Sequence, residues 1–185
     1  MSSLAETFKK IIFFLKKNNY KYTVIGGIAS SVIGNPRFTG DIDICLLINA
    51  DEAEDFLIKA GKTGFKVNKN EMLGRIKETG TFQIQDNRLH VDFIIVSTEF
   101  EKKVIERSKK TKIYNITALL PTPEDLILLK IVPGRPIDIN DIENIVIRHK
   151  GKLDIKYLNN WAMKLSDESQ NMRIYNELQR ILKNR

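Results

Sequence analysis

Residues 22–48 carry the strongest indication of the fold, and their sequence is YTVIGGIASSVIGNPRFTGDIDICLLI. The first four residues are rich in β-branched side chains and are bounded by Gly26-Gly27, which is typical of a short strand. Residues 28–33 have the composition of a short helix that ends at Gly34-Asn35-Pro36. The interior of residues 41–48 is apolar enough for a strand inside a sheet. The stretch therefore predicts a strand, a glycine turn, a short helix and a second, buried strand.

The flanking sequence extends this pattern to further strands and helices. Apolar residues at helical spacing predict a first helix over residues 3–18. Periodicity and turn residues predict helices at 51–60, 98–108, 124–132, 140–149, 155–165 and 168–182, and strands at 65–67, 75–78, 81–85, 89–96 and 113–117. Mixed strands and helices followed by consecutive helices indicate an α/β fold. We divide it into a core over residues 1–118 and a helical C-terminal region over residues 119–185.

The composition excludes several classes of protein. The chain has 185 residues, of which 42% are hydrophobic and 29% charged, so it can bury a sizeable core and is not disordered. No apolar stretch is long enough for a membrane span or for the core of a signal peptide. A single cysteine, Cys45, excludes an internal disulfide and a cysteine-rich zinc site. We expect a cytoplasmic protein with no membrane partner, and nothing in the sequence specifies its oligomeric state.

The net charge of +7 is unevenly distributed along the chain. Residues 1–40 carry a net charge of +5 and residues 150–185 carry +4, whereas residues 41–149 carry −2. Basic ends on either side of an acidic middle suit a polyanionic partner. The alternative is that lysine-rich helices only keep the chain in solution.

Gly26-Gly27 lies between a predicted strand and a predicted helix, where phosphate groups often bind. Glycine allows a tight turn and a close approach of a ligand to the backbone. The start of a helix offers unpaired N–H groups and the positive end of a dipole, and Ser30 adds a hydroxyl. The alternative is a purely structural turn, because Gly-Gly turns are common.

Three acids form a candidate metal site. Asp41 and Asp43 open a buried strand, where alternation places both carboxylates on one face, about 6.6 Å apart along the strand. Such a pair can share hard ions such as Mg²⁺, or both acids can simply point into water. Asp92 lies within an apolar strand, where burial is costly without a partner or a metal ion. If the two strands are neighbours, the three carboxylates converge.

These motifs resemble those of the nucleotidyltransferase superfamily that has a DNA polymerase β-type catalytic core, and especially those of the AbiEii/AbiGii toxin-like nucleotidyltransferases. The similar pattern is Gly-Gly-x-Ala, then Arg-x-Thr-x-Asp-Ile-Asp, then a lone Asp, found here at residues 26–29, residues 37–43 and Asp92. The Pro-Glu-Asp, Lys and Arg-x-x-Asp segments of that family are similar to residues 123–125, Lys130 and residues 135–138. The resemblance covers residues 22 to about 145.

The resemblance implies a nucleotidyltransferase-type mixed sheet flanked by helices, with a helical C-terminal part. It implies that Asp41, Asp43 and Asp92 are catalytic and hold two Mg²⁺ ions, with Mn²⁺ as the alternative. The residues that it implies for nucleotide binding are Gly26, Gly27, Ser30, Arg37, Thr39, Lys130, Asp138 and Asp141. Several of these also have structural alternatives: a salt bridge for the arginine, a surface position for the lysine, and helix caps for the last two acids.

The activity that the resemblance implies is the transfer of a nucleoside monophosphate from an NTP to an acceptor hydroxyl. The acceptor would be a tRNA end or a protein side chain, and the basic ends suit RNA. The resemblance also implies a toxin of a toxin–antitoxin or phage-defence system, with an antitoxin as a partner. Two alternatives are a small-molecule antibiotic nucleotidyltransferase and a non-catalytic module that binds a nucleotide or a partner protein.

Overall fold

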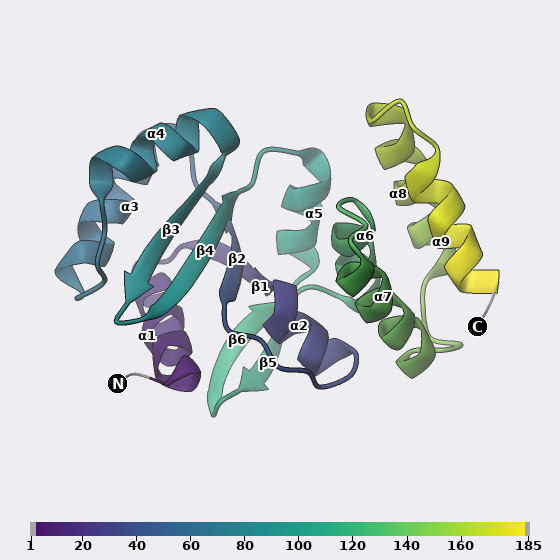
Figure 1. Ribbon diagram of the computed structural model, residues 1–185, viewed down its shortest axis with the longest axis horizontal. Helices are drawn as coiled ribbons and strands as arrows, with labels where there is room; N and C mark the ends of the chain where they lie inside the picture. Colours follow the sequence, from purple (N-terminus) through teal and green to yellow (C-terminus); the bar gives the residue numbers. More distant parts are fainter. Residues whose placement is uncertain (1–2, 184–185) are drawn as a thin grey trace. The chain divides into compact units, whose positions relative to one another are not determined.

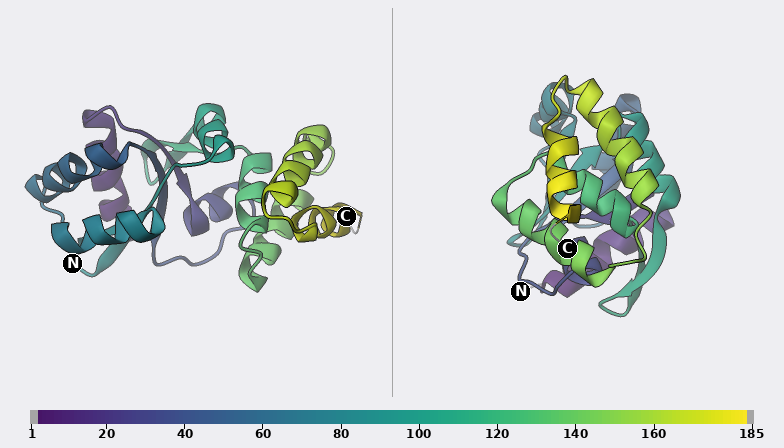
Figure 2. Two further views of the ribbon diagram at one scale, coloured as in Figure 1. Left: turned by 90° about the horizontal axis from the view of Figure 1, so that it is seen from above. Right: turned by 90° about the vertical axis from the view of Figure 1, so that its right-hand side faces the viewer.

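The computed structural model describes residues 3–183. Residues 1–2 of the predicted core and residues 184–185 of the predicted C-terminal region lie outside it. The described chain forms two compact units (Figures 1 and 2). The first contains the residues up to Ile28 together with Phe38–Leu120, and the second contains Ala29–Arg37 together with the residues from Pro121 onward. The domain boundary between residues 118 and 119 stays a prediction, since compactness alone does not show that either part folds by itself.

A four-stranded mixed sheet with the order β1-β2-β4-β3 forms the centre of the first unit. Its strands are β1 (Lys21–Ile25), β2 (Ile42–Leu47), β3 (Thr81–Asp86) and β4 (Leu89–Ile95). The central pair, β2 and β4, is parallel, and the two outer pairs are antiparallel. Most side chains of β2 are buried, as expected for a strand with neighbours on both sides. The predicted mixed sheet is confirmed.

Two of the helices in the first unit cover the aromatic face of this sheet. The helices of the first unit are α1 (Leu4–Lys17), α3 (Ala50–Lys62), α4 (Lys69–Thr79) and α5 (Glu99–Arg107), together with the start of α2 (Gly26–Ile33). The ring of Phe56 on α3 lies 5.2 Å from that of Phe14 on α1, and it also contacts Phe82 and Phe93 of the sheet. α1 and α3 therefore pack on one face, which Figure 1 shows behind the sheet. Because side chains alternate along a strand, Gln83 and Asp92 point to the opposite face.

Two of the predicted strands are wrong. Residues 75–78 lie in α4, which buries Met72 and Ile76 at the helical spacing of four residues. Two apolar anchors in a mostly polar segment give a weak periodic signal, which explains the error. Residues 113–117 form the end of a hairpin between β5 (Lys109–Ile113) and β6 (Ile116–Leu120). Tyr114 and Asn115 both have positive φ there, and a tyrosine is not the residue that predicts such a turn.

Residues 65–67 were expected as a strand, but only Lys66 takes part in the sheet. It forms an isolated antiparallel bridge with Gln85 of β3, with N···O distances of 2.8 and 3.0 Å. The predicted strand over residues 65–67 is therefore also wrong as a strand, since only this single bridge joins the segment to the sheet.

Four helices make up most of the second unit: α6 (Pro123–Ile131), α7 (Pro136–Arg148), α8 (Ile155–Glu168) and α9 (Arg173–Lys183). α6 packs against the other three, which explains why Leu126, Ile127, Leu128 and Ile131 are all fully buried. Thr122 caps α6 and Pro123 occupies its first turn, as the sequence predicts for a helix start. Within residues 3–183, none of the helices combines the length and the apolar character that crossing a bilayer requires.

Candidate functional site

The acids of the predicted metal site lie on the face of the sheet opposite the aromatic core. Asp43 of β2 and Asp92 of β4 are Cα partners in the parallel pair, and Ile25 and Gln83 continue the same row across the sheet. Partners in register have side chains on the same face, and neighbouring strands are about 4.8 Å apart. The structure therefore brings Asp43 and Asp92 side by side, and both are half-buried.

Asp41 stands at the edge of this row. It lies one residue before β2 and is exposed to solvent. Its backbone carbonyl accepts a hydrogen bond of 3.4 Å from the hydroxyl of Thr39. This hydrogen bond holds the Thr39 side chain against the segment that contains Asp41 and Asp43.

Gln83 was not predicted from the sequence, although it contacts a predicted catalytic residue. Its Nε2 donates a hydrogen bond of 2.8 Å to Oδ1 of Asp92, which fixes the orientation of that carboxylate. A signal for this contact existed. Asn87-Arg88, between the strands predicted at 81–85 and 89–96, is typical of a turn, and a hairpin that turns there places Gln83 opposite Asp92.

The turn between β1 and α2 lies directly against Asp43. Gly26 is the first residue of α2 and has a φ of +62°, a conformation that favours glycine. A Cβ at this position would lie 2.5 Å from Cγ of Asp43 and would overlap its carboxylate. Glycine therefore lets this carboxylate approach the N-terminal end of a helix, where the partial positive charge favours an anion.

Gly27 has a different neighbour. A Cβ on Gly27 would lie 2.7 Å from Cβ of Thr39, so the threonine side chain packs on the glycine. Ser30, one turn further along α2, is only 1% exposed and is part of the second unit. The structure thus places Gly26, Gly27 and Thr39 in the first unit with the three acids, whereas the Ser30 hydroxyl is buried.

The other predicted nucleotide-binding residues form a network of ion pairs within the second unit. The Lys130 ammonium lies 3.1 Å from Oδ1 of Asp138 and 2.8 Å from Oδ2 of Asp141. Arg37 donates two hydrogen bonds of 2.9 Å to the two oxygens of Asp141. Arg135, which was not predicted, donates to Asp138 at 2.6 Å. The side chains of the lysine and of both aspartates are at least nine-tenths buried.

These contacts control the charge of the two buried acids. Burial raises the pKa of Asp138, but hydrogen bonds from Arg135 and Lys130 outweigh it, so that the pKa is lowered. Burial likewise raises the pKa of Asp141, and hydrogen bonds from Arg37 and Lys130 again lower it. Both acids are therefore ionised at neutral pH. The network also connects Arg37, four residues before Asp41, to α6 and α7 of the same unit.

The donor set in the first unit fits a divalent cation in its chemistry. Carboxylate oxygens are the ligands that Mg²⁺ and Mn²⁺ prefer, and the register places two of the three acids next to each other. The side chains do not form a complete set of ligands as they stand. Among residues 3–183, no three His, Cys, Asp or Glu side chains are positioned to hold one metal ion.

The chain belongs to a family of nucleotidyltransferases of unknown function (DUF6036), whose model matches residues 2–184. By family and fold it is therefore a nucleotidyltransferase, and the predicted superfamily is confirmed. The narrower likeness to AbiEii/AbiGii toxins stays a prediction. No protein with curated annotation is significantly similar to this chain in sequence.

Solved structures of low sequence identity share the fold. An antigenic nucleotidyltransferase-like protein from Paracoccidioides brasiliensis is 16% identical with a TM-score of 0.54, and the match covers 97% of this chain and 92% of that one. The enzyme ANT(2")-Ia, in complex with adenylyl-2"-tobramycin, is 11% identical with a TM-score of 0.60, covering 91% and 99%. The lincosamide antibiotic adenylyltransferase LnuA, with lincomycin bound, is 16% identical with a TM-score of 0.53, covering 82% and 98%.

Proposed function

We propose that the protein transfers a nucleoside monophosphate from an NTP to an acceptor hydroxyl, with Asp41, Asp43 and Asp92 as its catalytic residues. The observation that carries this proposal is the parallel register of Asp43 and Asp92, beside the glycine turn that starts α2. Two adjacent carboxylates repel each other unless a cation lies between them. A helix start next to them offers N–H groups for phosphate oxygens.

In this proposal Asp43 and Asp92, completed by the exposed Asp41, hold two Mg²⁺ ions, with Mn²⁺ as the alternative. When bound, such ions neutralise the phosphates and lower the pKa of the acceptor hydroxyl. The chain itself contributes positioning. Gln83 keeps the Asp92 carboxylate in one orientation through its hydrogen bond. Gly26 lets the start of α2 lie against the Asp43 carboxylate, which brings the positive end of the helix dipole next to the proposed metal and phosphate site.

We propose that five residues of the second unit also serve nucleotide binding, mainly by positioning other groups. These residues are Ser30, Arg37, Lys130, Asp138 and Asp141. Their contacts support a positioning role, because the Lys130 ammonium already has two carboxylate partners. Asn35 adds to this role with a hydrogen bond of 2.9 Å to Asn144 of α7, which holds the segment before Asp41. A phosphate contact from Lys130 would compete with these ion pairs.

For the acceptor we propose RNA, most simply a tRNA end, ahead of a protein side chain. The support is the net charge of +5 over residues 1–40 and of +4 over residues 150–185, which favours a polyanion. A toxin role with an antitoxin partner remains a prediction from the resemblance, and a cytoplasmic location remains a prediction from the composition and the single cysteine.

The test is a transfer assay with each of the four α-³²P-labelled NTPs, Mg²⁺, total tRNA and cell lysate. The proposal predicts label in RNA that depends on Mg²⁺ and is lost in Asp43→Asn. The matched control is Asp55→Asn, which changes an exposed acid on α3 and should leave transfer unchanged. Label in a small molecule would favour the antibiotic-type alternative, and no label with any NTP would favour a non-catalytic binding module.

A further inference from the structure

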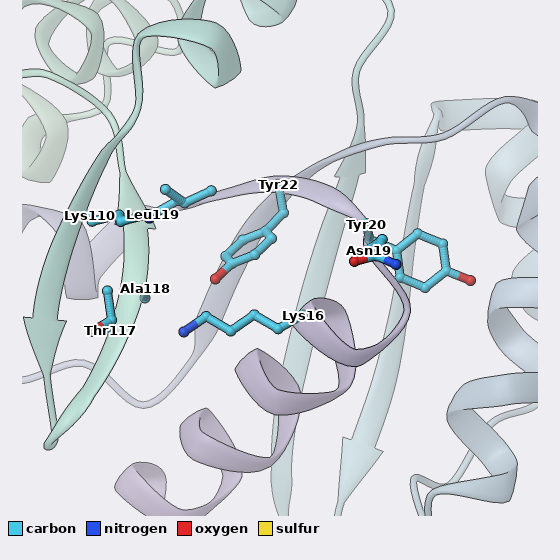
Figure 3. Close-up of a pocket in the computed structure, with 8 residues that line it drawn as sticks. All are labelled: Lys16, Asn19, Tyr20, Tyr22, Lys110, Thr117, Ala118 and Leu119. Carbon is cyan, nitrogen blue, oxygen red and sulfur yellow. The ribbon is translucent and has the colours of Figure 1, made fainter.

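A cavity of about 590 Å³ lies in the first unit, away from the row of acids. The C-terminal end of α1, the start of β1 and the β5–β6 hairpin surround it (Figure 3). Tyr22 lines it and pairs with Leu46 in the sheet, so it points to the face that α1 covers, whereas Asp43 points to the other face. Small-molecule sites usually have volumes of about 300–1,000 Å³, and the cavity falls in this range.

The hydroxyl of Tyr22 is an unsatisfied polar group at this cavity. Tyr22 is 2% exposed, and its hydroxyl has no hydrogen-bond partner of good geometry among residues 3–183, although the main chain of Leu119 lies close enough to lower its pKa slightly. Burial raises the pKa of Tyr22, and the nearby main chain of Leu119 offsets only part of this effect. The hydroxyl therefore keeps its proton. Its oxygen is itself buried, so a ligand reaches this donor by displacing a neighbouring side chain. Figure 3 shows it turned toward Lys16 and the hairpin.

Two lysines give the cavity a positive charge. Lys16 comes from α1 and Lys110 from β5, and no acidic side chain lines the cavity. Within the described part of the chain, neither ammonium is paired with a carboxylate. Lys10, on the same helix, is by contrast paired with Asp86 at 2.7 Å. Two free cations and a free hydroxyl donor from three separate elements match a ligand with a doubly charged oxyanion.

Apolar surface completes the site. The ring of Tyr22, the side chains of Ala118 and Leu119 and the stems of the two lysines border the cavity, and more of its wall is apolar than polar. We propose that this cavity binds a small phosphate monoester with an apolar or aromatic body. Lys16 and Lys110 pair with the phosphate, the Tyr22 hydroxyl donates to it, and the body lies against Leu119. The site is separate from the transfer reaction and does not depend on it.

The test is a titration of the full chain with phenyl phosphate, followed by ¹H–¹⁵N NMR shifts. We expect saturable shifts at the cavity, weaker binding of inorganic phosphate, and none of phenol. Tyr22→Phe keeps the ring and removes only the hydroxyl, so it should bind about tenfold more weakly. Its melting temperature should be unchanged or higher, because an unsatisfied buried group is removed. Lys16→Gln and Lys110→Gln should each weaken binding at least threefold.

The matched control is Lys17→Gln, an exposed lysine on α1 that does not line the cavity, and it should bind like the wild type. No binding of phenyl phosphate at millimolar concentration would overturn the proposal, as would equal weakening in Lys17→Gln. A lower melting temperature of Tyr22→Phe would show that the hydroxyl stabilises the folded protein, and this result would also overturn the proposal. An oligouridylate forms the second arm. If it binds through the two lysines and phenyl phosphate does not, the surface is a nucleic-acid contact and the proposal is wrong.

Discussion

Replacement of Lys130 by Met should destabilise the protein strongly, because it removes the shared cation of two buried acids. Asp138 and Asp141 are 1% and 3% exposed, and each has Lys130 as one of its partners. Loss of one partner from a buried pair costs about 3–5 kcal/mol. Each acid keeps an arginine, so we expect the lower end of this range, about 3 kcal/mol at pH 7. For a chain of this size that corresponds to a fall of about 6–12 °C in melting temperature.

The pH dependence gives this prediction a definite sign. Both acids have a lowered pKa in the folded protein. Their contribution to the free energy of unfolding is therefore fully present above the unfolded pKa of about 3.9, and it is lost as the pH falls through the folded pKa. In Lys130→Met the folded pKa of both acids rises. The difference in the free energy of unfolding between wild type and variant should therefore be largest at neutral pH and shrink below about pH 4.

Urea denaturation between pH 3 and pH 8 measures this difference. The control is Lys103→Met, which removes an exposed ion pair with Glu106 and should change stability little. A difference for Lys130→Met below about 1 kcal/mol, or one that does not vary with pH, would show that Lys130 does not stabilise the two buried acids. The same variant tests nucleotide binding. If Lys130 contacts a phosphate, the folded variant should bind NTP more weakly than the wild type, and if it only positions, NTP affinity should be nearly unchanged.

Three further predictions concern the candidate site and the acceptor. Gly26→Ala should abolish transfer and lower the free energy of unfolding by about 1–3 kcal/mol, because its Cβ overlaps the Asp43 carboxylate. Thermal unfolding measures this loss, and the control is Gly61→Ala, where a Cβ meets nothing within 4 Å. Gln83→Leu should lower kcat at least tenfold with KM for NTP little changed, because Asp92 loses its orienting bond, and an unchanged kcat would contradict this role. The third prediction concerns three exposed lysines of α1, which are Lys9, Lys16 and Lys17. Their joint replacement by Gln should weaken RNA binding and flatten its log–log salt slope by about 0.7 per lost phosphate contact, and an unchanged slope would indicate that they only aid solubility.

Local sequence signals were sufficient to predict most of the helices and strands of the first unit. The alternation in residues 41–48 and the turn residues Gly26-Gly27 and Asn87-Arg88 define both the strands and the face that carries the acids. What they did not define is which strands are neighbours. The parallel pairing of β2 with β4 joins segments more than forty residues apart, and only the structure shows it.

The contacts of the second unit could not be predicted for a similar reason. Residues 29–37 belong to this compact unit although they lie between two strands of the first. Arg37 reaches Asp141 across more than a hundred residues of sequence, and no periodic pattern records such an ion pair. A salt bridge was one of two alternatives for Arg37 at the level of the sequence, and the structure contains one.

The lysines of α1 show how charge counts can mislead at single positions. Lys10 resembles its neighbours in the sequence, but its ammonium bonds to Asp86 at 2.7 Å and to the carbonyl of Gly64 at 2.9 Å. It is therefore part of the fold and does not belong with the exposed lysines available to a polyanion. The partner, Asp86, also accepts a hydrogen bond from Thr7, which keeps this acid buried and satisfied.

The most direct test of the proposed metal-dependent site is the binding of Mn²⁺, followed by electron paramagnetic resonance in the presence of a non-hydrolysable NTP. We expect tightly bound Mn²⁺ in the wild type and its loss in Asp43→Asn and in Asp92→Asn, while Asp55→Asn binds as the wild type does. Equal Mn²⁺ binding by all four proteins would contradict the claim that the adjacent carboxylates of β2 and β4 hold the metal.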